Sequence, residues 1–357
     1  MHKTSEDPTL NLNHATPTKL LLTLLLPLLF ACGPGEESSS ETPVVEENKP
    51  LVVYSGRNQS LVEGILKRFE EATGQVTEVR YGGTAELAAT LLEEGSGTPC
   101  DVFIAQDAGA LGAVAKAGMF RPLPSDVLQR IPENFRSPAG DWVGLSGRAR
   151  VVVYNTEQIS PEDLPQSLEE VADERYKGRF GVAPANASFQ AHMAVYGAVH
   201  GAEALQDLLA GMVANDPQRY PKNSAIVEAV IQGEVDWGLV NHYYLWRALK
   251  ENPDAPGKNV AMPADASGGM ASFVNLAGAG ILSEHPGAAE LVRFLVGDEA
   301  QQYFAEETFE YPLVEGVGPS VDLAPLAELS AGQLDFAKVS EALPGALEAI
   351  SSTGLLQ

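Results

Sequence analysis

The sequence predicts an α/β protein built of two lobes, and three observations support this fold class. The chain has 357 residues, of which 45% are hydrophobic, which is enough for the cores of two domains of ordinary size. Strand-like and helix-like segments alternate three times between residues 51 and 118, and a second alternating set follows from residue 150. Such alternation is typical of a mostly parallel sheet flanked by helices, where ligands bind outside the carboxyl ends of the strands.

The N-terminal segment predicts a signal peptide and a tether. The apolar run at 20–31 follows Lys19 and is too short to span a membrane comfortably. It ends in Leu-Phe-Ala-Cys at 29–32, which resembles a lipobox, so residues 1–31 are expected to be a lipoprotein signal peptide and Cys32 to be lipidated. An ordinary secretory signal is the alternative. Residues 32–50 are polar and acidic, and predict a flexible tether to a membrane.

The first alternating set begins directly after this tether. Residues 51–54 are a β-type run, and Ser60 with Glu63 forms a capping-box pattern for a helix that Gly74 ends. The set continues with a strand at 76–81, a helix at 84–92 capped by Thr84, a strand at 101–105, and a helix capped by Asp107 that stops at Gly118.

The second set repeats the alternation with longer helices. Its expected strands lie at 150–154, 235–240 and 271–281. Its expected helices lie at 188–200, 203–212, 224–231, 286–296 with Pro286 in the first turn, and 336–350. Two such lobes joined by crossing strands would form a cleft that opens and closes by a hinge motion.

Composition and motifs exclude several function classes. The formal net charge of -25 argues against nucleic acid as a partner, because phosphates are held by clustered Lys and Arg. The chain has no Cys-x-x-Cys, His-Glu-x-x-His or Walker sequence, and the Gly-Leu-Ser-Gly at 144–147 lacks the spacing of a nucleophile elbow. Ser146 with His242 is the best hydrolase pair available. Cys100 is expected to be an inert buried thiol. We therefore expect a binding protein and not an enzyme.

A pair of adjacent tyrosines carries the sharpest chemical signal. Tyr243 and Tyr244 follow the predicted strand that ends at Val240, and both can reach a cleft if a helix starts there. A hard trivalent cation prefers anionic oxygen, which a phenolate supplies once the metal lowers the tyrosine pKa from about 10. Taken alone, such a pair is more often simple aromatic packing.

Five segments, in order along the chain, resemble the bacterial ferric-ion-binding proteins, which are the substrate-binding components of iron(III) ABC transporters. The segments are Val-Tyr-Ser-Gly-Arg at 53–57, Asp-Val-Phe at 101–103, the run from Trp142 to Tyr154, Lys-Asn-Ser at 222–224 and Asn-His-Tyr-Tyr at 241–244. The resemblance implies a two-lobed periplasmic-binding-protein type II fold. Its expected N-lobe is 51–148 plus about 272–325, and its expected C-lobe is 149–271 plus about 326–357.

The resemblance also implies that Tyr243 and Tyr244 bind Fe3+ as phenolates. Well-known members add a histidine and a glutamate where this chain has Asn58 and Gln106, and others add a tyrosine where it has Phe189. Asn58, Gln106 and Asp107 are therefore expected to be weak metal ligands at most, or to lie just behind the metal. Asp107 instead caps its helix if it does not approach the metal.

Two phenolates cannot fill a ferric site, so the family often adds a synergistic anion such as carbonate or phosphate. Backbone N–H groups at a helix start, amide side chains and arginines are the groups expected to hold this anion here. The candidates are Arg57, Arg148, Arg150, Asn186, Ala187, Ser188, Asn223 and Asn241. For Arg57, pairing with a surface carboxylate is the alternative.

The expected function is thus capture of Fe3+ outside the cytoplasmic membrane and delivery to an ABC permease with its ATPase. The protein is expected to be a lipid-anchored monomer in the cell envelope, on the periplasmic or extracellular face of a membrane. The alternative is a binding protein of the same fold for a small organic or oxyanion solute such as thiamine, a phosphonate or a polyamine, because Asn58 and Gln106 depart from the ferric ligand set.

Overall fold

Strands and helices alternate along the described part of the chain, residues 49–262, 272–329 and 336–357, in this computed structural model. These residues belong to one unit that spans residues 48 to 357. The expected signal peptide, Cys32 with its expected lipidation, and nearly all of the expected tether lie outside the described residues.

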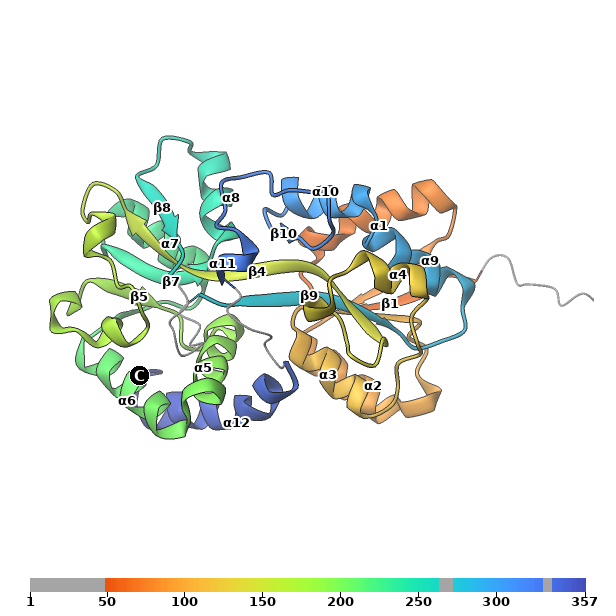
Figure 1. The fold of residues 1–357 in the computed structure, drawn as a ribbon, viewed down its shortest axis with the longest axis horizontal. Helices are drawn as coiled ribbons and strands as arrows, with labels where there is room; N and C mark the ends of the chain where they lie inside the picture. The colour runs from red at the N-terminus through yellow and green to blue at the C-terminus, as the bar shows by residue number, and fades with distance from the viewer. Residues whose placement is uncertain (1–48, 263–271, 330–335) are drawn as a thin grey trace, which may run out of the picture. The chain divides into compact units, whose positions relative to one another are not determined.

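Ten strands form two connected sheets, which are shown in Figure 1. The strands are β1 (Leu51–Ser55), β2 (Thr77–Tyr81), β3 (Val102–Ala105), β4 (Trp142–Asn155), β5 (Phe180–Val182), β6 (Gln218–Arg219), β7 (Trp237–Asn241), β8 (Gly257–Val260), β9 (Val274–Ile281) and β10 (Tyr311–Pro312). Their order is β2-β1-β3-β9-β4-β7-β5-β6, with β8 and β10 both paired to β4.

The long strand β4 belongs to both sheets. Its first half pairs with β9 and its second half pairs with β7, in both cases antiparallel. The strands farther from β4 are parallel: β1 with β2 and β3 in one sheet, and β5 with β6 and β7 in the other. The α/β fold class with mixed sheets is therefore confirmed. The antiparallel pairs gather where β4 and β9 run between the sheets (Figure 1).

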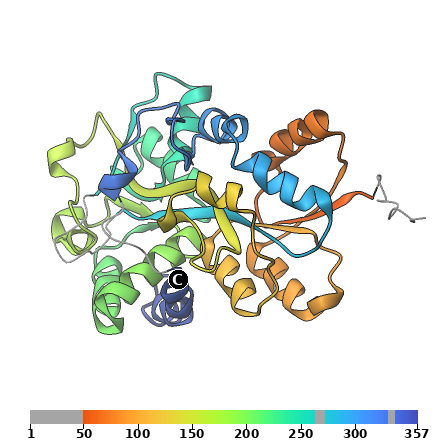
Figure 2. The ribbon, with the colours of Figure 1, turned by 45° about the vertical axis from the view of Figure 1, so that its right-hand side comes forward.

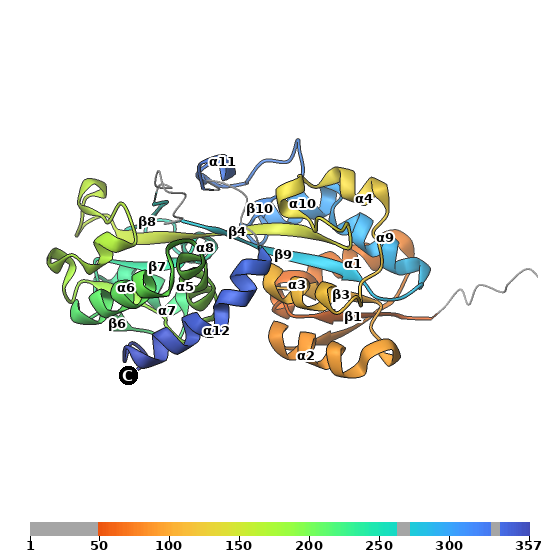
Figure 3. The same ribbon diagram turned by 60° about the horizontal axis from the view of Figure 1, so that its bottom comes forward.

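Helices cover both faces of each sheet. Around the first sheet lie α1 (Gln59–Thr73), α2 (Thr84–Glu94), α3 (Ala108–Lys116), α4 (Ser125–Arg130), α9 (Pro286–Leu295) and α10 (Asp298–Glu306). Around the second lie α5 (Ala187–His200), α6 (Ala202–Ala214), α7 (Asn223–Gln232) and α8 (Tyr243–Glu251), followed in sequence by α11 (Leu326–Leu329) and α12 (Phe336–Ser352). Figure 2 shows α1 and α9 opposite α2 and α3, and Figure 3 shows α12 beside α5 and close to α3.

Several element boundaries differ from the sequence prediction. The N-cap of α1 is Asn58, whose side-chain oxygen accepts a hydrogen bond from the backbone N–H of Ser60, so the predicted capping box was wrong by two residues. Thr84 is the first residue of α2, and its hydroxyl donates to the carbonyl of Gly56. β4 is much longer than the predicted 150–154, because it crosses from one sheet to the other.

A glycine allows the crossing strands β4 and β9 to pack closely. At Gly278 in β9 an added Cβ would lie 2.6 Å from the carbonyl oxygen of Val143 in β4.

Cys100 is a buried free thiol, as predicted, and burial raises its pKa to about 12. Among the described residues, no helix combines the length and the apolar character that crossing a bilayer requires.

Candidate functional site

The tyrosine pair lies at the start of α8, directly after β7. His242 is the N-cap of α8, and Tyr243 and Tyr244 are its first two residues. Their ring centroids are 4.4 Å apart, with Tyr243 buried and Tyr244 half-buried. The sequence predicted that both tyrosines can reach a cleft if a helix starts here. A helix does start at this point.

Arg150 in β4 ties this helix to its neighbours. One terminal nitrogen donates to the side-chain oxygens of Asn223 and Asn241, each at 3.2 Å, and the other donates to the carbonyl of Leu239 at 2.9 Å. The Arg150 side chain is buried, and this burial lowers its pKa to about 10, although nearby tyrosines oppose the shift.

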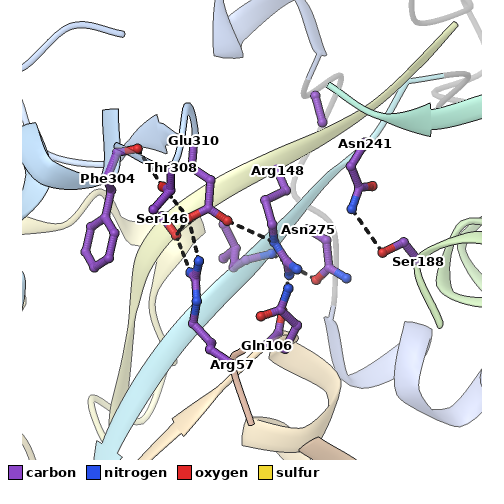
Figure 4. Close-up of polar contacts among 12 residues, drawn as sticks. Arg57, Gln106, Ser146, Arg148, Ser188, Asn241, Asn275, Phe304, Thr308 and Glu310 are labelled. Carbon is purple, nitrogen blue, oxygen red and sulfur yellow. Dashed lines mark hydrogen bonds and ion pairs between the residues drawn. The ribbon is translucent and has the colours of Figure 1, made fainter. Parts of the chain in front are cut away.

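The start of α5 joins the same network. Asn186 is its N-cap and accepts from the backbone N–H of Ser188, and Ala187 is the first helical residue. The Asn241 amide donates to the Ser188 hydroxyl at 3.0 Å, a contact drawn in Figure 4, and the Asn223 amide donates to Asn186 at 3.2 Å. The structure therefore brings together most of the residues predicted to hold an anion.

A second polar cluster is centred on Glu310, which the sequence did not single out. Its carboxylate accepts from Arg57 at 2.6 Å and from the Ser146 hydroxyl at 3.0 Å, and Arg57 also donates to Ser146 at 2.8 Å (Figure 4). All of these side chains are buried. The alternative prediction that Arg57 pairs with a surface carboxylate was therefore wrong, because its partner is a buried carboxylate.

Arg148 lies between this cluster and Gln106. Its guanidinium donates to the Gln106 carbonyl, and its Nε lies 3.8 Å from Glu310 Oε1. Burial lowers the pKa of Arg148 below its usual value, although Glu310 and Tyr243 oppose this shift. Burial would raise the pKa of Glu310, but Arg57 and Arg148 bring it below its usual value.

Three buried atoms around Arg148 have no hydrogen-bond partner among the described residues. They are Arg148 Nε, the side-chain oxygen of Gln106 and Glu310 Oε1. The side-chain oxygen of Gln106 therefore has no partner within the described part of the protein at the place where a metal or an atom just behind it was expected.

Asn58 and Asp107 act as helix caps. Asn58 is exposed and uses its side-chain oxygen at the start of α1, whereas Asp107 accepts from the backbone N–H of Ala110 at 2.9 Å at the start of α3. Of the two alternatives for Asp107, the structure shows capping. Phe189 is fully buried in α5.

The best hydrolase pair that the sequence offered does not form. His242 accepts from the backbone N–H of Ala149 at 3.1 Å and donates to the carbonyl of Phe309 at 2.7 Å, while Ser146 bonds to Arg57 and Glu310. Both imidazole nitrogens are thus occupied by backbone groups. Burial lowers the pKa of His242 to about 4, so it is neutral at pH 7.

Arg247 is a further site residue that sequence reasoning missed. It lies one turn after Tyr243 on α8, with its guanidinium carbon 5.2 Å from the centre of the Tyr243 ring. The spacing of four residues along a helix was a usable signal, because such residues share a face.

The two phenols are the candidate metal ligands of this site. No group of three His, Cys, Asp or Glu side chains within residues 49–262, 272–329 and 336–357 could hold a metal ion. Burial and the neighbouring Tyr243 raise the pKa of Tyr244, although Asn223 and Arg247 oppose this shift. Without metal the phenol is therefore protonated at neutral pH, and a strong Lewis acid is needed to bind it as phenolate.

The amino-acid sequence is similar to those of known proteins. The sequence profile of a family described as bacterial extracellular solute-binding protein matches residues 97–338. The chain is 31% identical to Iron uptake protein A1 of Synechocystis sp., covering 92% of this chain and 93% of that protein. It is 30% identical to the Fe(3+)-binding periplasmic protein of Serratia marcescens, covering 86% and 90%.

Solved structures agree with these sequences. Iron-bound HitA from Pseudomonas aeruginosa superposes with a TM-score of 0.78 at 31% identity, covering 85% of this chain and 99% of that one. A Trichodesmium protein in complex with iron and citrate superposes with a TM-score of 0.74 at 28% identity, covering 86% and 99%.

Proposed function

Because the chain belongs to the bacterial extracellular solute-binding proteins and, within them, to the ferric-ion-binding group, we propose that it binds Fe3+ and supplies it to an importer. The observation that carries this proposal is the pair Tyr243 and Tyr244 at the start of α8, beside the buried Arg150. Phenolate oxygen suits a hard trivalent cation, and no catalytic step is required.

The remaining coordination positions are filled by an exogenous anion or water. Backbone N–H groups at the start of α5 and the amides of Asn223 and Asn241 support anion binding, because a helix start favours negative charge. Arg148 and Gln106 lie close enough to one another to approach the same ligand from β4 and the end of β3. Carbonate and phosphate are the simplest candidates.

Transport would proceed by closure of two lobes around the ion. We assign 51–148 plus about 272–325 to one lobe and 149–271 plus about 326–357 to the other, with β4 and β9 as the connecting strands. The closed protein would dock on an ABC permease. Lipidation of Cys32 and the acidic tether would keep the monomeric protein at the membrane surface.

The test is a visible absorption titration of the purified protein with ferric citrate in bicarbonate buffer. A phenolate-to-iron charge-transfer band is expected in the parent protein. The band should shift or disappear in Tyr243→Phe and in Tyr244→Phe, whereas Tyr220→Phe serves as the control because Tyr220 follows β6 and is outside the network.

No band at stoichiometric iron would sink the ferric proposal. The search would then turn to thiamine, phosphonates and polyamines, the alternative solutes for this fold.

A further inference from the structure

The loop between α10 and β10, residues 307–310, contacts both ends of α8. At the start of α8, His242 Nε2 donates to the carbonyl of Phe309 at 2.7 Å. In the last turn, Lys250 Nζ lies 3.5 Å from a carboxylate oxygen of Glu307 and 5.7 Å from the centre of the Phe309 ring. In the division of lobes proposed above, the loop belongs to one lobe and α8 to the other.

His242, the residue before the tyrosine pair, is buried and uses all four of its polar groups. Its Nδ1 accepts from the backbone N–H of Ala149 in β4 at 3.1 Å, and its own backbone N–H donates to the carbonyl of Ala149 at 3.0 Å. Its carbonyl accepts from the side-chain amide of Asn259 in β8 at 2.8 Å, and its Nε2 holds Phe309. The first turn of α8, where Tyr243 lies, therefore cannot rotate without breaking hydrogen bonds to β4, β8 and the loop.

One peptide unit fixes the loop against His242. The carbonyl of Phe309 accepts from His242, while the N–H of the same peptide unit, that of Glu310, donates to the carbonyl of Phe304 in α10 at 3.0 Å. The Glu310 side chain is in turn held by the buried Arg57. A continuous series of contacts thus connects Arg57 through the loop to His242.

Phe309 has a backbone conformation that is unusual for its residue type. Its φ is 57°, in the left-handed region that favours glycine. A residue other than glycine stays there only where its surroundings determine the conformation. Here His242 holds the carbonyl of Phe309 and Lys250 lies against its ring. The loop is therefore held in a single arrangement against α8.

Two simpler roles for His242 do not account for this arrangement. Its imidazole is not free to bind a metal, because both ring nitrogens bond to backbone groups of Ala149 and Phe309. Although His242 is the N-cap residue of α8, its side chain makes no capping hydrogen bond to that helix. The ring instead connects β4 to the loop.

Resting on the ferric function proposed above, we propose that His242 is a positioning residue for iron and that it acts through the 307–310 loop. Its ring meets that of Tyr243 edge to face, with the centroids 5.8 Å apart, so it directs the phenol without touching the metal. Residues behind a metal ligand set the orientation of that ligand, and their loss typically lowers metal affinity by about 10–100-fold. The direction of Tyr243 in one lobe would thus be set by a loop of the other.

The experiment loads the purified protein with Fe3+ from ferric citrate in bicarbonate buffer. It measures the phenolate-to-iron band and the iron affinity in competition with added citrate. In His242→Ala the affinity should fall by about 10–100-fold and the band maximum should shift, because the band depends on the geometry of the iron–oxygen bond. His242→Gln, whose amide can donate to Phe309, should recover most of the affinity and the position of the band.

His285→Ala is the matched control. Like His242, His285 is a helix N-cap residue whose two ring nitrogens bond to backbone groups, the N–H of Gly287 and the carbonyl of Lys49, each at 3.1 Å. It lies at the start of α9, beside the first sheet. Its loss should change neither the band nor the iron affinity.

Phe309→Gly tests the loop with His242 and both tyrosines intact. Glycine adopts the left-handed φ without strain but also many other conformations, so the carbonyl at this position is no longer held toward His242. The affinity and the band should change in the same direction as in His242→Ala. This variant decides the question if circular dichroism shows that His242→Ala does not fold.

The outcomes separate this inference from the ferric function. Parental affinity and band in folded His242→Ala, or in Phe309→Gly if His242→Ala does not fold, would overturn the positioning role and leave the ferric function standing. Equal losses in His242→Ala and His285→Ala would also overturn it, because any damaged helix start would then have the same effect. No band in the parent would overturn the ferric function itself.

Discussion

At the scale of single residues, Glu310 is the buried carboxylate that faces two buried arginines. Its side chain is 1% exposed and faces Arg57 at 2.6 Å and Arg148 at 3.8 Å. Removing one partner of a buried ion pair leaves an uncompensated charge in a low-dielectric interior. Glu310 therefore determines whether two arginines can remain buried behind the candidate site.

We predict that Glu310→Gln lowers the free energy of unfolding by about 3–5 kcal/mol. Glu284→Gln, which removes an exposed partner of Arg121, should change it by less than about 1 kcal/mol. Urea denaturation at pH 7 measures both values. Equal stabilities for the two variants would show that the buried cluster does not contribute as its geometry suggests.

His242 gives the stability of the protein a dependence on pH. Burial lowers its pKa from 6.5 to about 4, so the folded protein holds the imidazole neutral while the unfolded chain binds a proton. Because the unfolded state binds more protons, stability is complete above pH 6.5 and is lost as the pH falls toward 4.

Between pH 7 and pH 5 the parent protein should lose about 2 kcal/mol of unfolding free energy through this one group. His242→Gln has no such titration and can still donate to Phe309. Its own loss over the same range should therefore be smaller by about that amount. Denaturant titrations at both pH values give the difference, and identical losses would contradict the assignment.

At the scale of elements, the start of α1 separates a structural role from a metal role. The Asn58 oxygen is 3.0 Å from the backbone nitrogen of Ser60, and the residue is exposed. We predict that Asn58→Ala lowers stability by about 1 kcal/mol, as loss of an N-cap does, and leaves ferric affinity unchanged.

Asn58→Ser keeps a capping oxygen and should restore most of the stability. Thermal unfolding and the absorption titration check the two effects. Loss of iron affinity in Asn58→Ala would return this residue to the metal site.

The contact of β4 with β9 is another property of elements. Gly278→Ala would place a Cβ 2.6 Å from the carbonyl of Val143, so the crossing strands would have to separate. We predict a loss of about 1–3 kcal/mol. Gly112→Ala is the matched control, since nothing lies within 4 Å of its added Cβ in α3, and a gain of about 0.5–1 kcal/mol is expected.

At the scale of the whole molecule, the proposed binding of iron by two phenolates would be coupled to proton release. Burial raises the pKa of Tyr244, so the metal-free phenol is protonated at pH 7. Binding as two phenolates should release about two protons per iron, and affinity should therefore fall as the pH is lowered.

Loading the weakly buffered protein from a ferric chelate and titrating the released acid measures this number, after the chelate alone is subtracted. Tyr244→Phe should release about one proton fewer. Equal release by the parent and by this variant would remove Tyr244 from the coordination sphere.

The sequence by itself determined the alternation of strands and helices, because hydrophobic periodicity and caps are local properties. It placed Tyr243 and Tyr244 at a strand end and Asn186 at a helix start, and both placements are confirmed. It also contained the resemblance to the ferric-ion-binding proteins. The length of β4 was predicted poorly. A local pattern does not show that a strand continues from one sheet into another, and the length of a crossing strand depends on both sheets.

Only the tertiary structure decided which side chains meet. The carboxylate that accepts from Arg57 lies 253 residues later in the chain. The side chain of Asn241, which accepts from Arg150, lies 91 residues later. Periodicity contains no information about such distant partners. Likewise, only the folded protein shows that Asn58 is a cap and that Arg150 is buried with no carboxylate partner in the described part of the chain. Those decisions depend on burial and charge compensation, which exist only once the sheets are assembled around β4.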